Sequence, residues 1–192
     1  MDRGKCTVTF KKINCLSIYM STGSVILSSL YFFLPAYIAN MMPVLVMKIP
    51  FLGKPVSSRL FGKNKTWRGL FFGTVAGGLI FWLQKIVYTS GFTSWGIIDY
   101  ADYSLLLGFL LGFGALAGDM AKSYYKRKAG IKEGEPWIPF DQLDFVFGGI
   151  IMSFFVYVPR AEVVLVLLLA SPLLHIIFNY IGYLLGLRKR MI

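Results

Sequence analysis

One segment of the chain, residues 118–144, concentrates opposite charges between two apolar stretches and reads GDMAKSYYKRKAGIKEGEPWIPFDQLD. Its acids include Asp119, Asp141 and Asp144, with five Lys or Arg residues between them. Clustered carboxylates repel one another unless a cation holds them, and oxygen ligands beside basic side chains suit Mg²⁺ that bridges a polyphosphate. Ionisable residues at a membrane border usually serve a function. The segment therefore predicts a metal site formed by these three aspartates.

Helical spacing would bring these charges together. If the helix that contains Asp119 continues past its apolar part, four polar residues follow at intervals of 3, 4, 7 and 8 and share one face. These are Lys122, Ser123, Lys126 and Arg127. Pro139 can open the next helix, so that Asp141 and Asp144 project together from its first turn. A purely structural role, in which the acids cap that helix and pair with nearby bases, is the alternative.

A second polar segment, FGKNKTWRG at residues 61–69, has the character of a ligand-binding loop at the start of a helix. Lys65, Thr66 and Arg68 are its candidate phosphate-binding residues. It is not a Walker A loop, because Asn64 follows Lys63 and Ser57 stands where the first glycine should be. The plain alternative is a basic flank that only sets membrane topology.

The elements that position these residues are apolar runs. They fall at about 24–47, 69–88, 104–121, 143–158 and 161–187, after a polar N-terminal segment at 1–23. A helix needs ~20 mostly apolar residues to cross a bilayer, so we expect an all-α integral membrane protein with about five transmembrane helices. The chain would form a single transmembrane domain over residues 1–192, with its site in two cytoplasmic polar loops. Pro35 and Pro43 predict a kinked or broken first helix.

Basic residues predict the orientation of the chain. They concentrate in the loops at 48–68 and 122–142 and at the C-terminus, which lie on one side if there are five crossings. The positive-inside rule makes that side cytoplasmic, with the N-terminus outside and the C-terminus inside. The net charge of +11 is explained in this way, so we expect no nucleic acid partner. Cys6 and Cys15 have no spacing typical of a zinc site.

Small residues four apart predict the faces through which the helices pack. The pairs are Gly73 with Gly77, Gly108 with Gly112, Gly114 with Gly118, and Gly182 with Gly186. Exposed glycine faces would also allow a homodimer.

Both polar segments resemble the integral-membrane, CTP-dependent phosphatidate cytidylyltransferases. The similarity lies in KTWRG at 65–69 and in a GD, S, KR, K and PxxDxxD series from Gly118 to Asp144. Four features depart from the bacterial pattern, namely Arg68 in place of an acid, Glu133 in place of Asp, the absence of the HGG segment, and Gln142 in place of Arg. The short chain and the KTWRG form are similar to the archaeal branch, the CDP-archaeol synthases.

This resemblance implies that CMP passes from CTP to a membrane lipid phosphate, 2,3-bis-O-geranylgeranyl-sn-glycerol 1-phosphate, with release of pyrophosphate. Asp119, Asp141 and Asp144 would hold Mg²⁺, and Lys126, Arg127 and Lys132 would contact the triphosphate. Lys65, Thr66 and Arg68 would bind the lipid phosphate or share in binding the CTP phosphates. Ser123 would position a metal ligand or a phosphate oxygen. The catalytic set is thus Asp119, Asp141, Asp144 and Lys126.

Three other functions compete with this prediction. The first is a phosphatidate cytidylyltransferase that acts on ester lipids. The second is a CDP-alcohol phosphatidyltransferase, whose DGxxAR motif is missing here because Met120 and Ala121 follow Asp119. The third is a membrane transporter or scaffold without enzymatic activity, which would leave the match of two separate segments to one enzyme signature unexplained.

Overall fold

The computed structural model describes residues 22–132, 135, 137–138 and 140–184, and their regular structure is almost wholly helical. The helices are α2 (Thr22–Phe32), α3 (Leu34–Leu45), α4 (Trp67–Thr89), α5 (Leu106–Lys128), α6 (Phe140–Ser153) and α7 (Ala161–Leu184). One isolated antiparallel bridge joins Pro55 to Thr66. Predictions about residues 1–21, Glu133, Pro139 and Gly186 fall outside the described residues.

Some of the helices are long and apolar enough to cross a bilayer, as expected of a helical membrane protein. Among the described residues, α4 and α5 are long and apolar enough to cross a membrane. The bent pair α2–α3 adds a third membrane span if the two helices are counted together as a single span. Helix α6 has 14 residues and ends at Ser153, although the apolar run continues to 158. Five crossings therefore remain a prediction, and the structure supports two or three.

The first apolar run is broken next to Pro35, as predicted, whereas Pro43 lies inside α3, which continues to Leu45. Helices α2 and α3 meet at Phe33 with a bend of 49°. Pro35 has no N–H to donate to the carbonyl of Tyr31, four residues earlier. The side chain of Gln84, buried on α4, donates its Nε2–H to that carbonyl instead. A polar residue in a membrane helix thus satisfies a backbone group that the proline leaves free.

Glycines bring α5 into close contact with helices on both sides. Toward α4, a Cβ on Gly77 would lie 2.7 Å from the carbonyl oxygen of Gly108. Toward α6, a Cβ on Gly118 would overlap the carbonyl oxygen of Asp144, and one on Gly148 would overlap that of Gly114. The three described glycine pairs are therefore packing faces, as predicted, and they pack within the chain rather than at a dimer interface.

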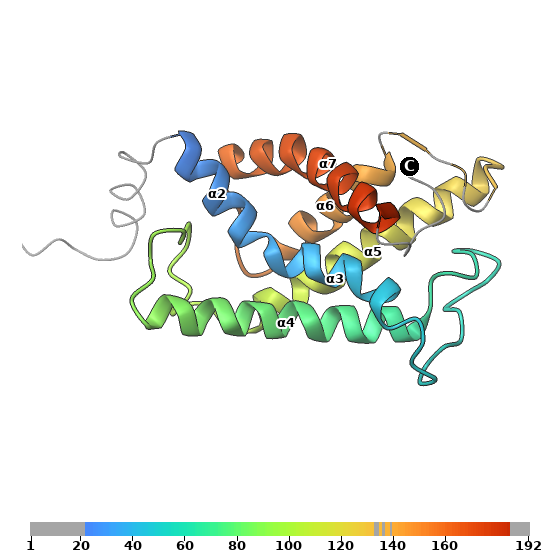
Figure 1. The fold of residues 1–192 in the computed structure, drawn as a ribbon, viewed down its shortest axis with the longest axis horizontal. Helices are drawn as coiled ribbons and strands as arrows, with labels where there is room; N and C mark the ends of the chain where they lie inside the picture. The colour runs from blue at the N-terminus through green and yellow to red at the C-terminus, as the bar shows by residue number, and fades with distance from the viewer. Residues whose placement is uncertain (1–21, 133–134, 136, 139, 185–192) are drawn as a thin grey trace, which may run out of the picture.

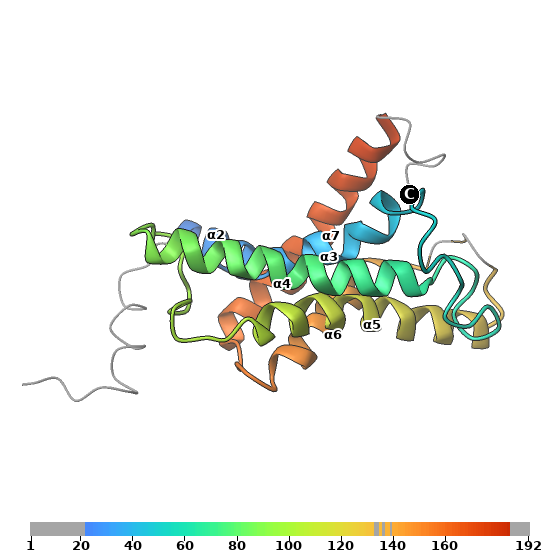
Figure 2. The ribbon, with the colours of Figure 1, turned by 90° about the horizontal axis from the view of Figure 1, so that it is seen from below.

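The order of the helices brings both polar loops to one end of the molecule. Helices α4 and α5 lie side by side, and the segments that precede α4 and follow α5 meet at the same end (Figures 1 and 2). The 90–105 connection lies at the opposite end (Figure 1). Helix α7 rises away from the other helices at an angle (Figure 2). The end that holds the two polar loops is the place where the predicted site can form.

Candidate active site

The loop before α4 is held in shape by its backbone. Val56 N–H donates to Lys65 O at 2.8 Å, Trp67 N–H to Lys54 O at 3.1 Å, and Arg68 N–H to Leu52 O at 2.8 Å. Thr66 is the N-cap of α4, and its hydroxyl accepts a hydrogen bond from Gly69 N–H at 3.2 Å. These bonds fix the direction in which the Lys65 side chain leaves the backbone.

Helix α5 continues two turns beyond its apolar run, as the spacing of its charges predicts. Residues 122–128 are mostly good helix formers, and the last turn contains Lys126, Arg127 and Lys128, which favour the negative end of the helix dipole. The helix ends in a Schellman motif: Ile131 N–H donates to Lys126 O, and Gly130 N–H donates to Arg127 O, both at 3.1 Å. Gly130 has a φ of +75°, which favours glycine.

The centre of the site is the ammonium of Lys122, which lies among three carboxylates. Its Nζ is 3.1 Å from Asp119 Oδ1, 2.9 Å from Asp141 Oδ1 and 2.9 Å from Asp144 Oδ2. Asp119 and Lys122 come from α5, while Asp141 and Asp144 come from the first two turns of α6. The close glycine contact between α5 and α6 makes this arrangement possible, because it brings their polar ends together.

Two further lysines complete this group, which we call the ion cluster: Lys65, Asp119, Lys122, Lys126, Asp141 and Asp144. Lys65 pairs with Asp119 Oδ2, and Lys126 Nζ lies 3.1 Å from Asp141 Oδ2. The cluster is half-buried to buried, with exposed fractions of 8% for the Lys126 side chain and 5% for Asp144. Three lysines thus face three carboxyl groups, and burial together with the charge of Asp119 raises the pKa of Asp144 to about 7.

Asp141 is the carboxylate of the cluster with the largest number of described donors. It accepts hydrogen bonds from Lys122, Lys126 and the backbone N–H of Trp137. Burial alone would raise the pKa of Asp141, but the hydrogen bonds and the charges of these lysines outweigh that effect and lower it. Asp141 is therefore a carboxylate at neutral pH and is available as an oxygen ligand.

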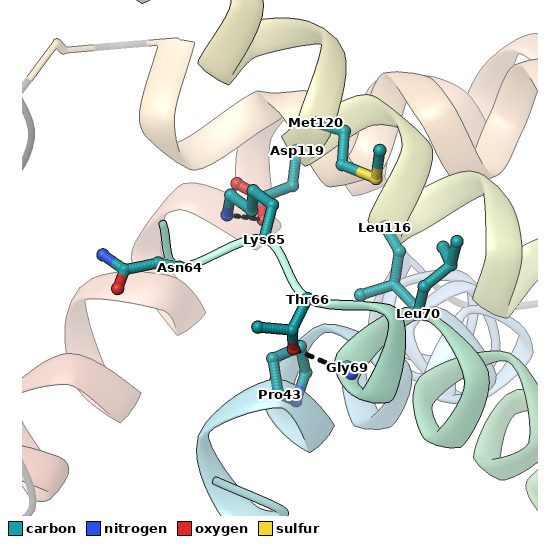
Figure 3. A pocket seen from close by; sticks show the side chains of 9 residues that line it. All are labelled: Pro43, Asn64, Lys65, Thr66, Gly69, Leu70, Leu116, Asp119 and Met120. Carbon is teal, nitrogen blue, oxygen red and sulfur yellow. Dashed lines mark hydrogen bonds and ion pairs between the residues drawn. The ribbon is translucent and has the colours of Figure 1, made fainter. Parts of the chain in front are cut away.

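A small pocket lies between the KTWRG loop, α5 and the end of α3. Its polar side is lined by Asn64, Lys65, Thr66 and Asp119, and its apolar side by Pro43, Leu70, Leu116 and Met120. Figure 3 shows Lys65 and Asp119 facing each other at this pocket, with Thr66 beside them. The pocket thus offers a charged end and an apolar wall to the same ligand.

The predicted site residues divide into two groups. Lys65, Asp119, Lys126, Asp141 and Asp144 are brought together in the ion cluster, and Thr66 borders it. Ser123 is buried next to it and donates its hydroxyl hydrogen to Asp119 O at 2.8 Å.

The other three predicted phosphate-binding residues have different partners. The guanidinium of Arg68 donates to Ile49 O, and that of Arg127 donates to Ile131 O at 2.5 Å. The side chain of Lys132 is exposed, and its backbone N–H donates to Glu135 Oε2. In this structure, both arginines therefore stabilise backbone turns at the rim of the site.

Lys122 was not among the predicted site residues. The available signal was its position three residues after Asp119 and four before Lys126, which places it on the same helix face as both. The hydrogen bond from the backbone N–H of Trp137 to Asp141 was also not predicted, because every residue except proline has such a donor and the residue type does not reveal its partner.

A divalent cation would have to replace Lys122. Among the residues that the structure describes, no three acidic, histidine or cysteine side chains already form a metal-binding group. The three carboxylate oxygens surround Lys122 Nζ at 2.9–3.1 Å, whereas Mg²⁺ binds oxygen at about 2.1 Å. Each oxygen would therefore have to move inward by roughly 1 Å once the ammonium had left. With that change, the donor set fits a hard cation.

Comparison with known proteins decides the family. A family profile described as CarS-like, CDP-archaeol synthase, matches residues 22–191. The chain belongs to the CDP-archaeol synthase family. It is 36% identical over 175 residues to the CDP-archaeol synthase of Thermococcus onnurineus, covering 87% of this chain and 96% of that protein. It is 35% identical to that of Methanospirillum hungatei over 170 residues, covering 81% and 98%.

A solved structure agrees with this family. The protein, described as an intramembrane enzyme for archaeal membrane lipids biosynthesis, is 32% identical, with a TM-score of 0.63 and coverage of 80% of this chain and 94% of that one. The chain is therefore an enzyme, a membrane-bound cytidylyltransferase of the CDP-archaeol synthase family, as its two polar segments predicted. The transporter and scaffold alternatives are excluded.

Proposed function

We propose that this CDP-archaeol synthase family member transfers CMP from CTP to 2,3-bis-O-geranylgeranyl-sn-glycerol 1-phosphate, with release of pyrophosphate. The observation that carries the proposal is the ion cluster, which lies at the polar ends of α4, α5 and α6 beside a pocket with an apolar wall. A reaction between a soluble nucleotide and a membrane lipid needs this combination of opposite charges and apolar surface.

The reaction requires no general base. A phosphate monoester has a second pKa near ~6, so the lipid phosphate is mostly dianionic at neutral pH. One of its oxygens attacks the α-phosphorus of CTP, and the bond from that phosphorus to the bridging α–β oxygen breaks. Both electrons of that bond leave with pyrophosphate. The protein then has to align the two substrates and neutralise their charges.

The lysines of the ion cluster are suited to that task. Lys65 approaches from the KTWRG loop and Lys126 from the end of α5, so they reach the cluster from two directions. A phosphate held between them would be aligned relative to both loops. Lys65 also lines the pocket, and for this reason we place the lipid phosphate on its side and the triphosphate nearer to Lys126.

Asp119, Asp141 and Asp144 would hold Mg²⁺, which supplies charge neutralisation on the transferred and leaving phosphates when it is bound. Carboxylate oxygens are the ligands that Mg²⁺ prefers, and the lowered pKa of Asp141 keeps its carboxylate ionised. Thr66 and Ser123 would support this arrangement, because one caps α4 at the pocket and the other bonds to the backbone of Asp119.

We further propose that the site faces the cytoplasm, where CTP is found. The loop at 48–68 and the end of α5 hold most of the described basic residues and lie at one end of the molecule (Figure 1). The positive-inside rule assigns that end to the cytoplasmic side.

The first test is pyrophosphate release by the detergent-purified protein with CTP, Mg²⁺ and either the geranylgeranyl ether phosphate or a diacyl phosphatidate. We expect release with the ether lipid, little with the ester lipid, and none after chelation by EDTA. Release with the ester lipid alone would overturn the proposed lipid substrate. Full activity in EDTA would overturn the metal assignment.

A further inference from the structure

The three acidic side chains of the ion cluster meet around an amine that belongs to the same protein. Lys122 Nζ is within 3.1 Å of one oxygen from each of Asp119, Asp141 and Asp144, and 15% of its side chain is exposed. By contrast, Lys126 contacts Asp141 alone, and Lys65 contacts Asp119 alone. Lys122 is thus the one described cation that lies between all three carboxylates.

The fit of the ammonium to this position is incomplete. Asp144 Oδ2 is buried and, within the described part of the chain, accepts no hydrogen bond of ordinary geometry, although Lys122 Nζ is 2.9 Å away. A buried carboxylate oxygen without a directed donor is costly. A divalent cation held between the three carboxylates would bind this oxygen directly as a ligand.

Charge gives a second reason why Lys122 and a cation exclude each other. The lysines at 65, 122 and 126 already supply at least as much positive charge as the three aspartates supply negative charge. A divalent cation added to this half-buried group would leave at least two uncompensated positive charges and would lie next to the ammonium. The flexible four-carbon stem of lysine allows the ammonium to leave, and the triphosphate that enters with the metal supplies new anionic oxygens for it.

We propose that Lys122 takes the place of the divalent cation in the cation-free protein and moves onto the triphosphate when the metal-bound nucleotide enters. The inference rests on the proposed function, since it assumes that the metal lies between these carboxylates. Lys122 would then have two roles. It keeps the three carboxylates together before the substrates bind, and it couples metal entry to nucleotide entry.

The test is Mn²⁺ binding in the absence of nucleotide, measured from the loss of the free-ion EPR signal, for the purified full-length protein and its K122M and K122Q variants. Removal of the competing ammonium should tighten Mn²⁺ binding by tenfold or more in both variants. Because the triphosphate loses a partner, the KM for CTP should rise in the same variants. Unchanged or weaker Mn²⁺ binding would overturn the proposal.

Two control variants separate displacement from a general effect of charge. K126M also removes a positive charge next to Asp141, but it leaves Lys122 in place, so we expect a clearly smaller gain in Mn²⁺ affinity. K128M removes a charge from an exposed position in the same helical turn and should change nothing. Equal gains in K122M and K126M would show that Lys122 is only one ion-pair partner among several.

Folding of the variants is part of the test. Loss of Lys122 leaves three carboxylates facing one another, so K122M should melt at a lower temperature than the parent protein, and Mn²⁺ should raise its melting temperature more than that of the parent. Failure of both variants to fold even in millimolar Mn²⁺ would overturn the proposal, because the cation could not then replace the ammonium. Absence of pyrophosphate release by the parent protein would instead contradict the proposed function.

Discussion

Asp119 is the residue at which the two polar segments meet. It pairs with Lys65 from the loop before α4 and with Lys122 from the next turn of its own helix. Asp119→Asn replaces the carboxylate by a neutral amide, so the two lysines lose their shared anion and the proposed metal loses a charged ligand. We expect pyrophosphate release to fall more than tenfold, which corresponds to over ~1.4 kcal/mol of activation free energy.

The matched control for this change is Asp102→Asn. Asp102 is an exposed acid in the connection at the opposite end of the molecule, so its loss changes the net charge by the same amount and leaves the ion cluster intact. Turnover of D102N should equal that of the parent protein. If D119N kept more than a tenth of the parent turnover at saturating Mg²⁺, Asp119 would not be a metal ligand.

The sequence predicted the acids of this site but not all of its bases. Asp119, Asp141 and Asp144 follow from helical periodicity at the ends of apolar runs, which depends on local spacing. Arg68 was predicted to bind phosphate because of its neighbours in KTWRG, yet its guanidinium donates to Ile49 O across a loop. The partner of a long side chain depends on where the backbone runs in the folded protein, and the periodicity of the sequence does not predict this.

Helices α5 and α6 are held together by contacts that only glycine permits. A Cβ on Gly118 would overlap the carbonyl oxygen of Asp144, so Gly118→Val must push α6 away from α5. Overpacking of this kind costs ~1–3 kcal/mol. We expect a lower melting temperature, measured by the fluorescence of the native tryptophans. We also expect a loss of turnover, because Asp144 would move away from Asp119 and Lys122.

Ala121 provides the control on the same helix. It is exposed, so Ala121→Val adds two methyl groups and a β-branched side chain at the surface of α5. This variant should melt within a degree or two of the parent protein and keep its activity. A variant G118V that behaved like A121V would mean that α5 and α6 do not pack as closely as the structure has them.

At the break between α2 and α3, a side chain from a third helix donates a hydrogen bond to the backbone. Gln84→Leu would leave the carbonyl of Tyr31 without its donor, at a cost of ~1–3 kcal/mol for an unsatisfied buried group. We expect thermal stability to fall while the KM for CTP stays constant, since Gln84 lies on α4 away from the ion cluster.

A double variant tests the cause of that loss. Pro35→Ala restores an N–H that can donate to the Tyr31 carbonyl, so P35A combined with Q84L should be more stable than Q84L alone. Additive losses from the two changes would instead show that Gln84 stabilises the protein through packing and not through the carbonyl that Pro35 leaves free.

For the whole molecule, the sequence predicted the helical class and the positions of the polar loops better than the number of membrane crossings. The helical class and the positions of the polar loops followed from apolar runs of membrane length. The number of crossings stays a prediction, because α6 ends at Ser153 within a run that is still apolar. Composition measures how apolar a run is, and it does not show where the helix ends.

The position of both polar loops on one membrane face can be tested with single cysteines. In a background with Cys6→Ser and Cys15→Ser, cysteines replace exposed residues at Lys54, Lys128 or Ser94. Lys54 and Lys128 flank the site, whereas Ser94 lies in the connection at the opposite end (Figure 1). An impermeant maleimide should label positions 54 and 128 in inside-out vesicles and position 94 in right-side-out vesicles. Labelling of 54 and 128 from opposite sides would separate the two halves of the ion cluster across the bilayer, and the site could not exist as the structure has it.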